Sequence, residues 1–263
     1  MDFSPQDMLP RVESAVRESG GIIQDHWSRA KNIRHKGRVD LVTETDVAVE
    51  RDLSARLDAI LPEAGFLAEE TASGGDLQGT TWIVDPLDGT TNFAHGLPFV
   101  AVSVALWSGG EVVLGVIHLP RLGETFSAIK EGGAWLNHQP IRVSATGDLE
   151  SSLTATGFPY DIRTRSEEEI QRLKRVLVQT RGIRRMGAAA VDLAYTACGC
   201  FDAYYEVGLK PWDTAAGWLL TQEAGGKVTT FRGDPFHPFA ESILASNGRV
   251  HAEISNLLTA PTP

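Results

Sequence analysis

The spacing of apolar residues predicts two helices near the start of the chain. Apolar side chains recur at helical intervals over residues 5–30, although two adjacent glycines weaken the pattern. A second stretch of the same period ends near Pro62, and either Thr43 or Thr45 could cap its first turn. Asp46 would then lie in that first turn. We therefore expect a pair of helices before the first long strand.

Short apolar runs bounded by turn residues predict strands and further helices beyond residue 62. Two apolar runs between residues 99 and 119 are separated by Ser-Gly-Gly, which indicates a hairpin. Other strands are predicted over residues 65–68, 81–84, 124–130, 152–156 and 201–207 and near 228 and 243, with helices over 166–179, from 188, from 212 and near 250. The first half has the pattern of an antiparallel α+β unit, and the second alternates as in a layered α/β unit.

Two carboxylates stand where the strand over residues 81–84 ends. Asp85 and Asp88 flank Pro86, and proline cannot donate to a β-ladder, so we expect the backbone to turn away at that point. Gly89 and Thr90 suit a tight turn into a helix whose N–H groups could hold a phosphate. Carboxylates beside a phosphate would repel it unless they bind Mg²⁺, which prefers oxygen ligands. The hypothesis is Mg²⁺-dependent phosphate chemistry.

Composition narrows the class of protein. The chain has 263 residues, 42% of them apolar, and a formal charge of −10, which disfavours broad attraction to nucleic acid or anionic membranes. No apolar run approaches the roughly 20 residues of a membrane-spanning helix, and the N-terminus lacks signal-peptide features, so we expect a cytoplasmic protein. Cys198 and Cys200 are expected to be reduced packing residues. The basic clusters around Lys36 and over residues 181–185 are expected to be solvated loops.

Four ordered motifs resemble the inositol monophosphatase family, in a bacterial-type form. The longest, over residues 85–93, reads Asp-Pro-Leu-Asp-Gly-Thr-Thr-Asn-Phe; the others occupy residues 40–46, 67–71 and 210–217. Such an ordered set over nearly the whole chain is far more specific than a lone pair of aspartates. The resemblance implies a layered αβαβα sandwich of the sugar-phosphatase type. Its halves, residues 1–145 and 146–263, would form one structural unit with the active site between them.

The resemblance also implies roles for individual residues. The metal ligands would be Glu69, Asp85, the carbonyl of Leu87, Asp88 and Asp213, holding two or three Mg²⁺ ions. Glu70, Thr90 and Asp46 would orient or deprotonate the attacking water, and which of them takes the proton stays open. The substrate would contact Asp88, Gly89, Thr90, Gly187, Ala188, Ala189, Glu206 and Asp213. Many animal members carry a hydroxyl residue where this chain has Ala188.

Several of these residues also have a structural explanation. An aspartate in a first turn, such as Asp46, already favours the helix dipole, and Thr90 could be helix-start chemistry alone. Glu206 is as consistent with a strand-end acid as with a substrate contact. The pair Arg184 and Arg185 could form a subunit contact or a solvated surface. The ordered motifs nevertheless favour chemistry at the aspartates.

The resemblance implies hydrolysis of a phosphate monoester, foremost myo-inositol monophosphate, by metal-activated water and without a phosphoenzyme. Fructose 1,6-bisphosphate and histidinol phosphate are alternative substrates of the same superfamily. A role as a partner of the transcription or RNA-processing machinery is an alternative from another class. Lithium inhibition and a homodimer are further expectations.

Overall fold

The computed structural model describes residues 4–29, 33–35, 41–71, 77 and 79–261, so the prediction for Lys36 lies outside the described residues. The helices are α1 (Pro5–His26), α2 (Glu44–Ile60), α3 (Thr90–His95), α4 (Ile162–Leu177), α5 (Ala189–Ala197), α6 (Pro211–Glu223) and α7 (His251–Thr259). The strands are β1 (Ile33–His35), β2 (Leu41–Thr43), β3 (Gly65–Ala68), β4 (Thr81–Asp88), β5 (Ala101–Ser108), β6 (Glu111–Leu119), β7 (Glu124–Ile129), β8 (Gly133–Leu136), β9 (Gln139–Pro140), β10 (Leu153–Thr156), β11 (Gly182–Arg184), β12 (Ala203–Val207), β13 (Lys227–Thr229) and β14 (Ser242–Ser246).

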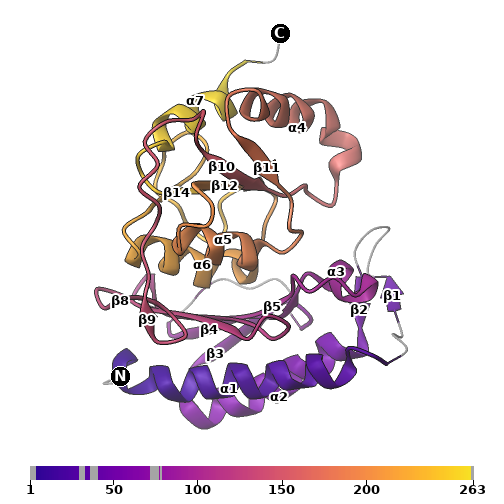
Figure 1. Cartoon of the computed structure of the whole chain (residues 1–263). Helices are drawn as coiled ribbons and strands as arrows, with labels where there is room; N and C mark the ends of the chain where they lie inside the picture. Colours follow the sequence, from indigo (N-terminus) through magenta and orange to yellow (C-terminus); the bar gives the residue numbers. More distant parts are fainter. Residues whose placement is uncertain (1–3, 30–32, 36–40, 72–76, 78, 262–263) are drawn as a thin grey trace.

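The elements stack in five layers, as Figure 1 shows. Helices α1 and α2 cover the outer face of a seven-stranded sheet, and α5 and α6 lie between this sheet and a five-stranded one. Helices α4 and α7 cover the far face of the smaller sheet. The layered αβαβα sandwich predicted from the motifs is therefore confirmed. The boundary near residue 145 stays a prediction.

The larger sheet is apolar on both faces. Its order is β3-β4-β5-β6-β7-β8-β9, with only β3 and β4 parallel. Side chains alternate along β5: Val102 and Val104 pack with α1 and α2, whereas Ala101 and Ala105 pack with α5 and α6. A strand buried on both faces reads as a continuous apolar run, which is how β5 appears in the sequence.

The backbone of α6 in the middle helical layer lies close to both β6 and α5. A Cβ added to Gly115 of β6 would lie 3.1 Å from the Ala216 Cα of α6, and one added to Gly217 would overlap Leu193 of α5. Small residues at these positions let α6 approach both β6 and α5. The middle helical layer is thereby held on two sides.

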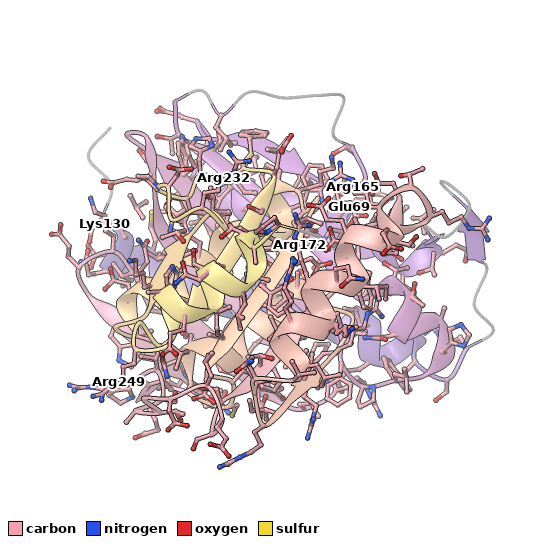
Figure 2. The ribbon with its side chains drawn as sticks, turned by 90° about the horizontal axis from the view of Figure 1, so that it is seen from above. Glu69, Lys130, Arg165, Arg172, Arg232 and Arg249 are labelled. Atoms are coloured by element: carbon pink, nitrogen blue, oxygen red, sulfur yellow. The ribbon has the colours of Figure 1, made fainter. Side chains whose placement is uncertain are left out.

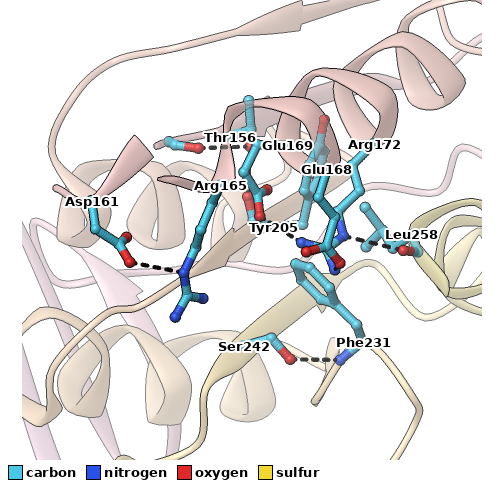
Figure 3. Close-up of polar contacts among 11 residues, drawn as sticks. Thr156, Asp161, Arg165, Glu168, Glu169, Arg172, Tyr205, Phe231, Ser242 and Leu258 are labelled. Atoms are coloured by element: carbon cyan, nitrogen blue, oxygen red, sulfur yellow. Dashed lines mark hydrogen bonds and ion pairs between the residues drawn. The ribbon is translucent and has the colours of Figure 1, made fainter. Parts of the chain in front are cut away.

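The smaller sheet has the order β11-β10-β12-β14-β13 and mixes two directions. Strands β11, β10 and β12 are parallel, whereas β14 is antiparallel to both β12 and β13. Its outer face holds Tyr205 and Phe231 against α4 and α7. Figure 3 shows Arg172 of α4 joining this layer, since its Nε donates to the Leu258 carbonyl of α7 at 3.3 Å.

Some sequence predictions were wrong in detail. The first helix ends at His26, short of residue 30, whereas of the two caps left open for α2 the structure has Thr43. Pro86 does not end β4: the ladder to β5 is interrupted between Asp85 and Asp88 and then resumes at Asp88. Proline is tolerated because the ladder is irregular where its missing N–H would be needed. The irregularity re-aims the two aspartates without ending the strand.

Short strands were also missed. The sequence patterns did not predict β1, β2, β8, β9 or β11, which have two to four residues each. The basic segment over residues 181–185, expected to be a solvated loop, includes β11 at the edge of the smaller sheet.

Charged side chains spread widely over the surface. Lys130, Arg232 and Arg249 lie on different parts of the molecule in Figure 2 and form no shared patch there. Among the described helices, none combines the length and apolarity needed to cross a membrane.

Candidate active site

A cavity of about 300 Å³ lies where the two sheets and the middle helices meet. Its walls come from the ends of β3, β4 and β12, the start of α3, α5 and α6, and the segment that follows β10. Most of the predicted site residues line it: Glu69, Asp85, Leu87, Asp88, Gly89, Thr90, Gly187, Ala188, Ala189, Glu206 and Asp213. Two predicted residues, Asp46 and Glu70, are not in the cavity wall. Segments far apart in the sequence therefore form one site.

Carboxylates dominate one side of this cavity. Burial raises the pKa of Asp85 well above its usual range, and the charges of Glu69, Asp88 and Asp213 raise it further. Burial also raises the pKa of Asp88, to about 7; the Ala190 amide opposes this effect, and Glu69 adds to it. The three strongest charge effects on Asp85 all come from other acids. Four carboxylates held this close favour either protonation or a bound cation.

Backbone amides fix one oxygen of each central aspartate. The Leu87 N–H donates to Asp85 Oδ1 at 2.9 Å, and the Ala190 N–H at the start of α5 donates to Asp88 Oδ2 at 2.6 Å. A second backbone hydrogen bond, from Ala189, also acts on the Asp88 carboxylate and lowers its pKa. The Lys210 N–H likewise donates to Asp213 Oδ2 at 2.7 Å, as part of the α6 capping box.

The donor set fits a hard divalent cation, because all the acids offer oxygen and like charges need neutralising. As they stand, no three His, Cys, Asp or Glu side chains in the described part of the chain form a closed metal-binding group. The carboxylates surround a cavity rather than a finished cage. Small side-chain rotations, with water ligands, would have to complete the coordination of Mg²⁺, which usually keeps several waters.

Asp46 stands directly behind the cavity wall. It is fully buried in the first turn of α2, where it completes a capping box with Thr43. Its Oδ1 accepts from the Thr90 hydroxyl at 2.9 Å, and the same hydroxyl lies 3.1 Å from the Leu87 carbonyl oxygen. Burial raises the pKa of Asp46, while the hydrogen bonds from Thr43 and Thr90 oppose the rise. Glu70, by contrast, is placed by its backbone N–H, which donates to Glu50 Oε2 at 2.9 Å.

Glu206 faces the carboxylate side from β12. Burial raises the pKa of Glu206 to about 7; a hydrogen bond from the Tyr204 hydroxyl and the charge of Arg185 oppose the rise, whereas Asp213 adds to it. Gly157 makes room for the acid, since a Cβ there would overlap the Glu206 carboxylate. The carboxylate of Glu206 is therefore positioned at the cavity by its surroundings, while its role in substrate binding stays a prediction.

Sequence reasoning missed several residues of the site. The segment Gly157–Tyr160 and Arg185 line the cavity, although Arg185 was expected at a subunit contact or a solvated surface. Asn92 holds the two halves of the site together, because its Nδ2 donates to the carbonyls of Phe99 at 2.7 Å and Met186 at 2.8 Å. The signature containing Asn92 was visible in the sequence, but its partner 94 residues away was not.

Comparisons with known proteins agree with this geometry. The model of the inositol monophosphatase family matches residues 5–260. An inositol-1-monophosphatase of Synechocystis is 40% identical over 98% of this chain and 92% of its own length. A fructose-1,6-bisphosphatase/inositol-1-monophosphatase of Thermotoga maritima is 38% identical over 94% of each chain. The Nus factor SuhB of Xylella fastidiosa is 37% identical over 94% of this chain and 92% of its own length.

A solved structure gives the same result in three dimensions. The extragenic suppressor protein suhB of Bartonella henselae superposes with a TM-score of 0.92 and 36% sequence identity, over 97% of this chain and all of that one. Sequence and structure similarity both extend beyond the motif segments to the whole described fold. The chain belongs to the inositol monophosphatase family.

Proposed function

We propose that this protein hydrolyses a phosphate monoester, myo-inositol monophosphate, to myo-inositol and phosphate with the help of Mg²⁺. The observation that carries the proposal is the set of acids from β3, β4 and α6 around a single cavity, with Glu206 facing them from β12. An acidic site of this kind binds a phosphate only together with cations.

Two or three Mg²⁺ ions would be held by Glu69, Asp85, Asp88, Asp213 and the carbonyl oxygen of Leu87. When bound, they would supply positive charge to the phosphate and lower the pKa of a water molecule. The chain keeps its central aspartates ready for this role by fixing one oxygen of Asp85 and one of Asp88 with backbone amides.

The attacking water would be oriented by the Thr90 hydroxyl, supported from behind by Asp46. Because the Thr90 hydroxyl donates its proton to Asp46, its oxygen can accept a hydrogen bond from a water molecule in the cavity. Glu70 is proposed as a further group that orients the water, although only its neighbour Glu69 lines the cavity. Thr90 is proposed to position the water and not to act as the nucleophile itself. We therefore expect direct attack by water and no phosphoenzyme.

The polyol half of the substrate would lie against the second half of the chain. Glu206 can accept hydrogen bonds from ring hydroxyls, and Gly187, Ala188 and Ala189 offer backbone groups beside it. The amides of Gly89 and Thr90 are proposed to contact phosphate oxygens. Asp88 and Asp213, at the border between the two regions, would contact both cation and substrate.

The test is phosphate release from inositol 1-phosphate, fructose 1,6-bisphosphate, histidinol phosphate and adenosine 3′,5′-bisphosphate, with and without Mg²⁺. Preferential release from inositol 1-phosphate, abolished in Asp88→Asn, would support both the mechanism and the substrate. Release only from another member of the panel would keep the metal chemistry and refute the substrate. No Mg²⁺-dependent release from any of them would refute the proposal.

A second substrate has a specific reason to be tested. The Thermotoga maritima relative carries both fructose-1,6-bisphosphatase and inositol-1-monophosphatase in its name. Arg185 lines the same cavity as Glu206 and could pair with a second phosphate. Arg185→Gln would then lower turnover of the bisphosphate more than turnover of the monophosphate.

The Xylella fastidiosa relative, a Nus factor, raises the alternative of a transcription partner. Retained cellular function in an Asp88→Asn strain without turnover would favour that role over catalysis. Lithium inhibition, a homodimer and a cytoplasmic location also stay proposals. Activity titrated with LiCl and the solution mass of the protein test the first two.

A further inference from the structure

The two cysteines of the chain lie side by side, away from the acidic cavity. Cys198 and Cys200 are both free thiols, and the Cys198 Sγ donates to the Cys200 Sγ across 3.5 Å. We propose that this pair is a thiol–disulfide exchange site, which closes reversibly to an intrachain disulfide on reaction with a low-molecular-weight disulfide. The expectation of two packing cysteines is wrong for Cys200, whose side chain is exposed.

A fixed turn brings the two thiols together. Cys198 is the C-cap of α5, and Gly199 follows in the left-handed region at φ +79°. The Cys200 N–H donates to the Tyr195 carbonyl at 2.9 Å, the bond from the sixth to the first residue that defines a Schellman turn. A Cβ on Gly199 would lie 3.0 Å from the Ser144 amide nitrogen, so the turn is packed from outside as well. The backbone is thus set before any oxidation occurs.

The two thiols have different chemical characters. The hydrogen bond from Cys198 lowers the pKa of the Cys200 thiol to about 7, against the opposing effects of partial burial and the Glu124 carboxylate. The pKa of Cys198 is raised by the same hydrogen bond and then by burial. The carboxyl end of α5 also disfavours negative charge on Cys198. Cys200 is therefore the accessible nucleophile, and Cys198 is the protected second thiol.

The surroundings set a limit on this reactivity. Glu124 lies close enough to disfavour both thiolates, and it accepts a hydrogen bond from the Tyr195 hydroxyl at 3.0 Å. Among the described residues, no cation is one of the main groups that shift the pKa of either thiol. The activation of Cys200 thus depends on its partner thiol, and removing Cys198 should raise the pKa of Cys200 toward that of an ordinary thiol.

The reaction balances in two exchanges. The Cys200 thiolate attacks one sulfur of the small disulfide, which forms a mixed disulfide and releases one thiolate. That thiolate takes the Cys198 proton, and Cys198 then attacks the Cys200 Sγ and expels the second small thiolate. The net change oxidises two protein thiols to one disulfide and reduces the small disulfide to two thiols. An excess of small dithiol runs the exchange backward.

The site is separate from the acidic cavity. Helix α5 has nine residues and starts at Ala189 in the cavity wall, so its carboxyl end lies about 13 Å away along the helix axis. The exchange can therefore be tested on thiols alone, and its result does not depend on the proposed phosphatase activity.

The experiment is mass spectrometry of the intact protein after incubation with glutathione buffers of rising oxidised fraction. The wild type should lose two hydrogen atoms, carry no glutathione, resist alkylation and recover both thiols with dithiothreitol. Cys198→Ser, which cannot close the ring, should retain one glutathione on Cys200. Cys200→Ser should be modified at least about tenfold more slowly.

Two results would overturn the proposal. One is a wild-type protein that retains glutathione without closing the ring, and the other is a protein that keeps both thiols even in pure oxidised glutathione. Gly199→Ala supplies a test of the turn, because an altered turn should leave more mixed disulfide and less closed ring. A thermal melt of each variant confirms that the comparison is made on folded protein.

Discussion

The Thr90 hydroxyl donates to Asp46 Oδ1 across 2.9 Å and so joins the start of α3 to the first turn of α2. The other oxygen of Asp46 accepts from the Thr43 N–H at 2.9 Å in the capping box. Thr90 lines the cavity, whereas Asp46 does not. One buried carboxylate thus both caps a helix and orients a hydroxyl at the proposed site of water attack.

Removal of the Thr90 hydroxyl should separate these two tasks. Thr90→Val keeps the side-chain shape but cannot donate to Asp46, so we expect kcat to fall by roughly 10²–10⁴-fold. Thr90→Ser keeps the hydroxyl and should retain activity within about tenfold of the wild type. Steady-state phosphate release, together with thermal melts, makes the comparison. Equal activity in the valine and serine variants would remove Thr90 from the mechanism.

Two glycines at the ends of α3 form a matched pair. Gly89 has φ +86° and Gly96 has φ +75°, but only Gly89 is crowded, since a Cβ there would lie 2.8 Å from the Phe99 carbonyl oxygen. Gly96→Ala should cost about 1–2 kcal/mol of unfolding free energy, from the left-handed backbone alone. Gly89→Ala should cost more than about 3 kcal/mol and displace the proposed phosphate amides. Urea unfolding of both variants tests the difference.

The acid cluster makes metal-free stability depend on pH. Burial raises the pKa of Asp88 and of Glu206 to about 7 and lifts the pKa of Asp85 well above its usual range, so the fold prefers these acids protonated. Their contribution is fully present below the unfolded pKa values near 4 and is lost as the pH rises through about 7. We expect Tm in EDTA to fall between about pH 6.5 and pH 8.5.

Mg²⁺ should reverse that loss, and its stabilising effect should grow with pH as proton competition disappears. Asp88→Asn should raise Tm in EDTA at about pH 8.5 and weaken the response to Mg²⁺. A Tm in EDTA that is flat with pH would contradict the charge cluster. Burial lowers the pKa of His251 to about 4, so this histidine destabilises the fold as the pH falls below about 6.5. A Tm measured above about pH 6.5 therefore reports on the acids without this effect.

Two arginines of α4 provide a stability test away from the cavity (Figure 3). Arg172 is 15% exposed and pairs at 2.5 Å with Glu169, which is 8% exposed. Arg172→Met would remove the cation that is hydrogen-bonded to the buried Glu169 and leave only the weaker effect of Arg165, at a cost of about 3 kcal/mol. Both side chains of the Arg165–Asp161 pair are about half exposed. Arg165→Met should therefore change the free energy of unfolding by less than about 1 kcal/mol. Neither change should alter kcat.

The parts of the fold that sequence could predict are those with local signals. The helix over residues 44–60 has a capping threonine, a regular apolar period and a proline just after its end, so local chemistry specifies it. The strands β5 and β6 are long apolar runs with a glycine turn between them. Strands β8 and β9 lack such signals, because each exists only through its neighbour in the sheet.

At Pro86, tertiary contacts override the local preference of proline to end a strand. A proline normally ends ladder pairing, but here β5 supplies partners on both sides of the irregularity, at Ser103 for Asp85 and Ala101 for Asp88. The prediction of a strand end holds for Asp88, the last residue of β4, but not for Asp85, which lies inside the strand. The partner strand that decides the course of the backbone follows the signature by only a few residues, but its register was not readable.

The site was predictable where a motif carried it and not where distant segments met. Arg185 and the segment after β10 have no motif of their own, and their place in the wall depends on the packing of the smaller sheet. Gly157 is a similar case, because its lack of a side chain matters only beside Glu206. The roles assigned to the individual acids stay predictions.

The middle layer has a consequence for synthesis on the ribosome. The larger sheet is made by residue 140, yet α5 and α6, which cover one of its apolar faces, are made only afterwards. At typical translation rates, the apolar face of the sheet stays exposed for several seconds before α5 and α6 are synthesised. The nascent chain is therefore exposed to aggregation and chaperone binding during that interval, and truncation before residue 223 would leave it so permanently.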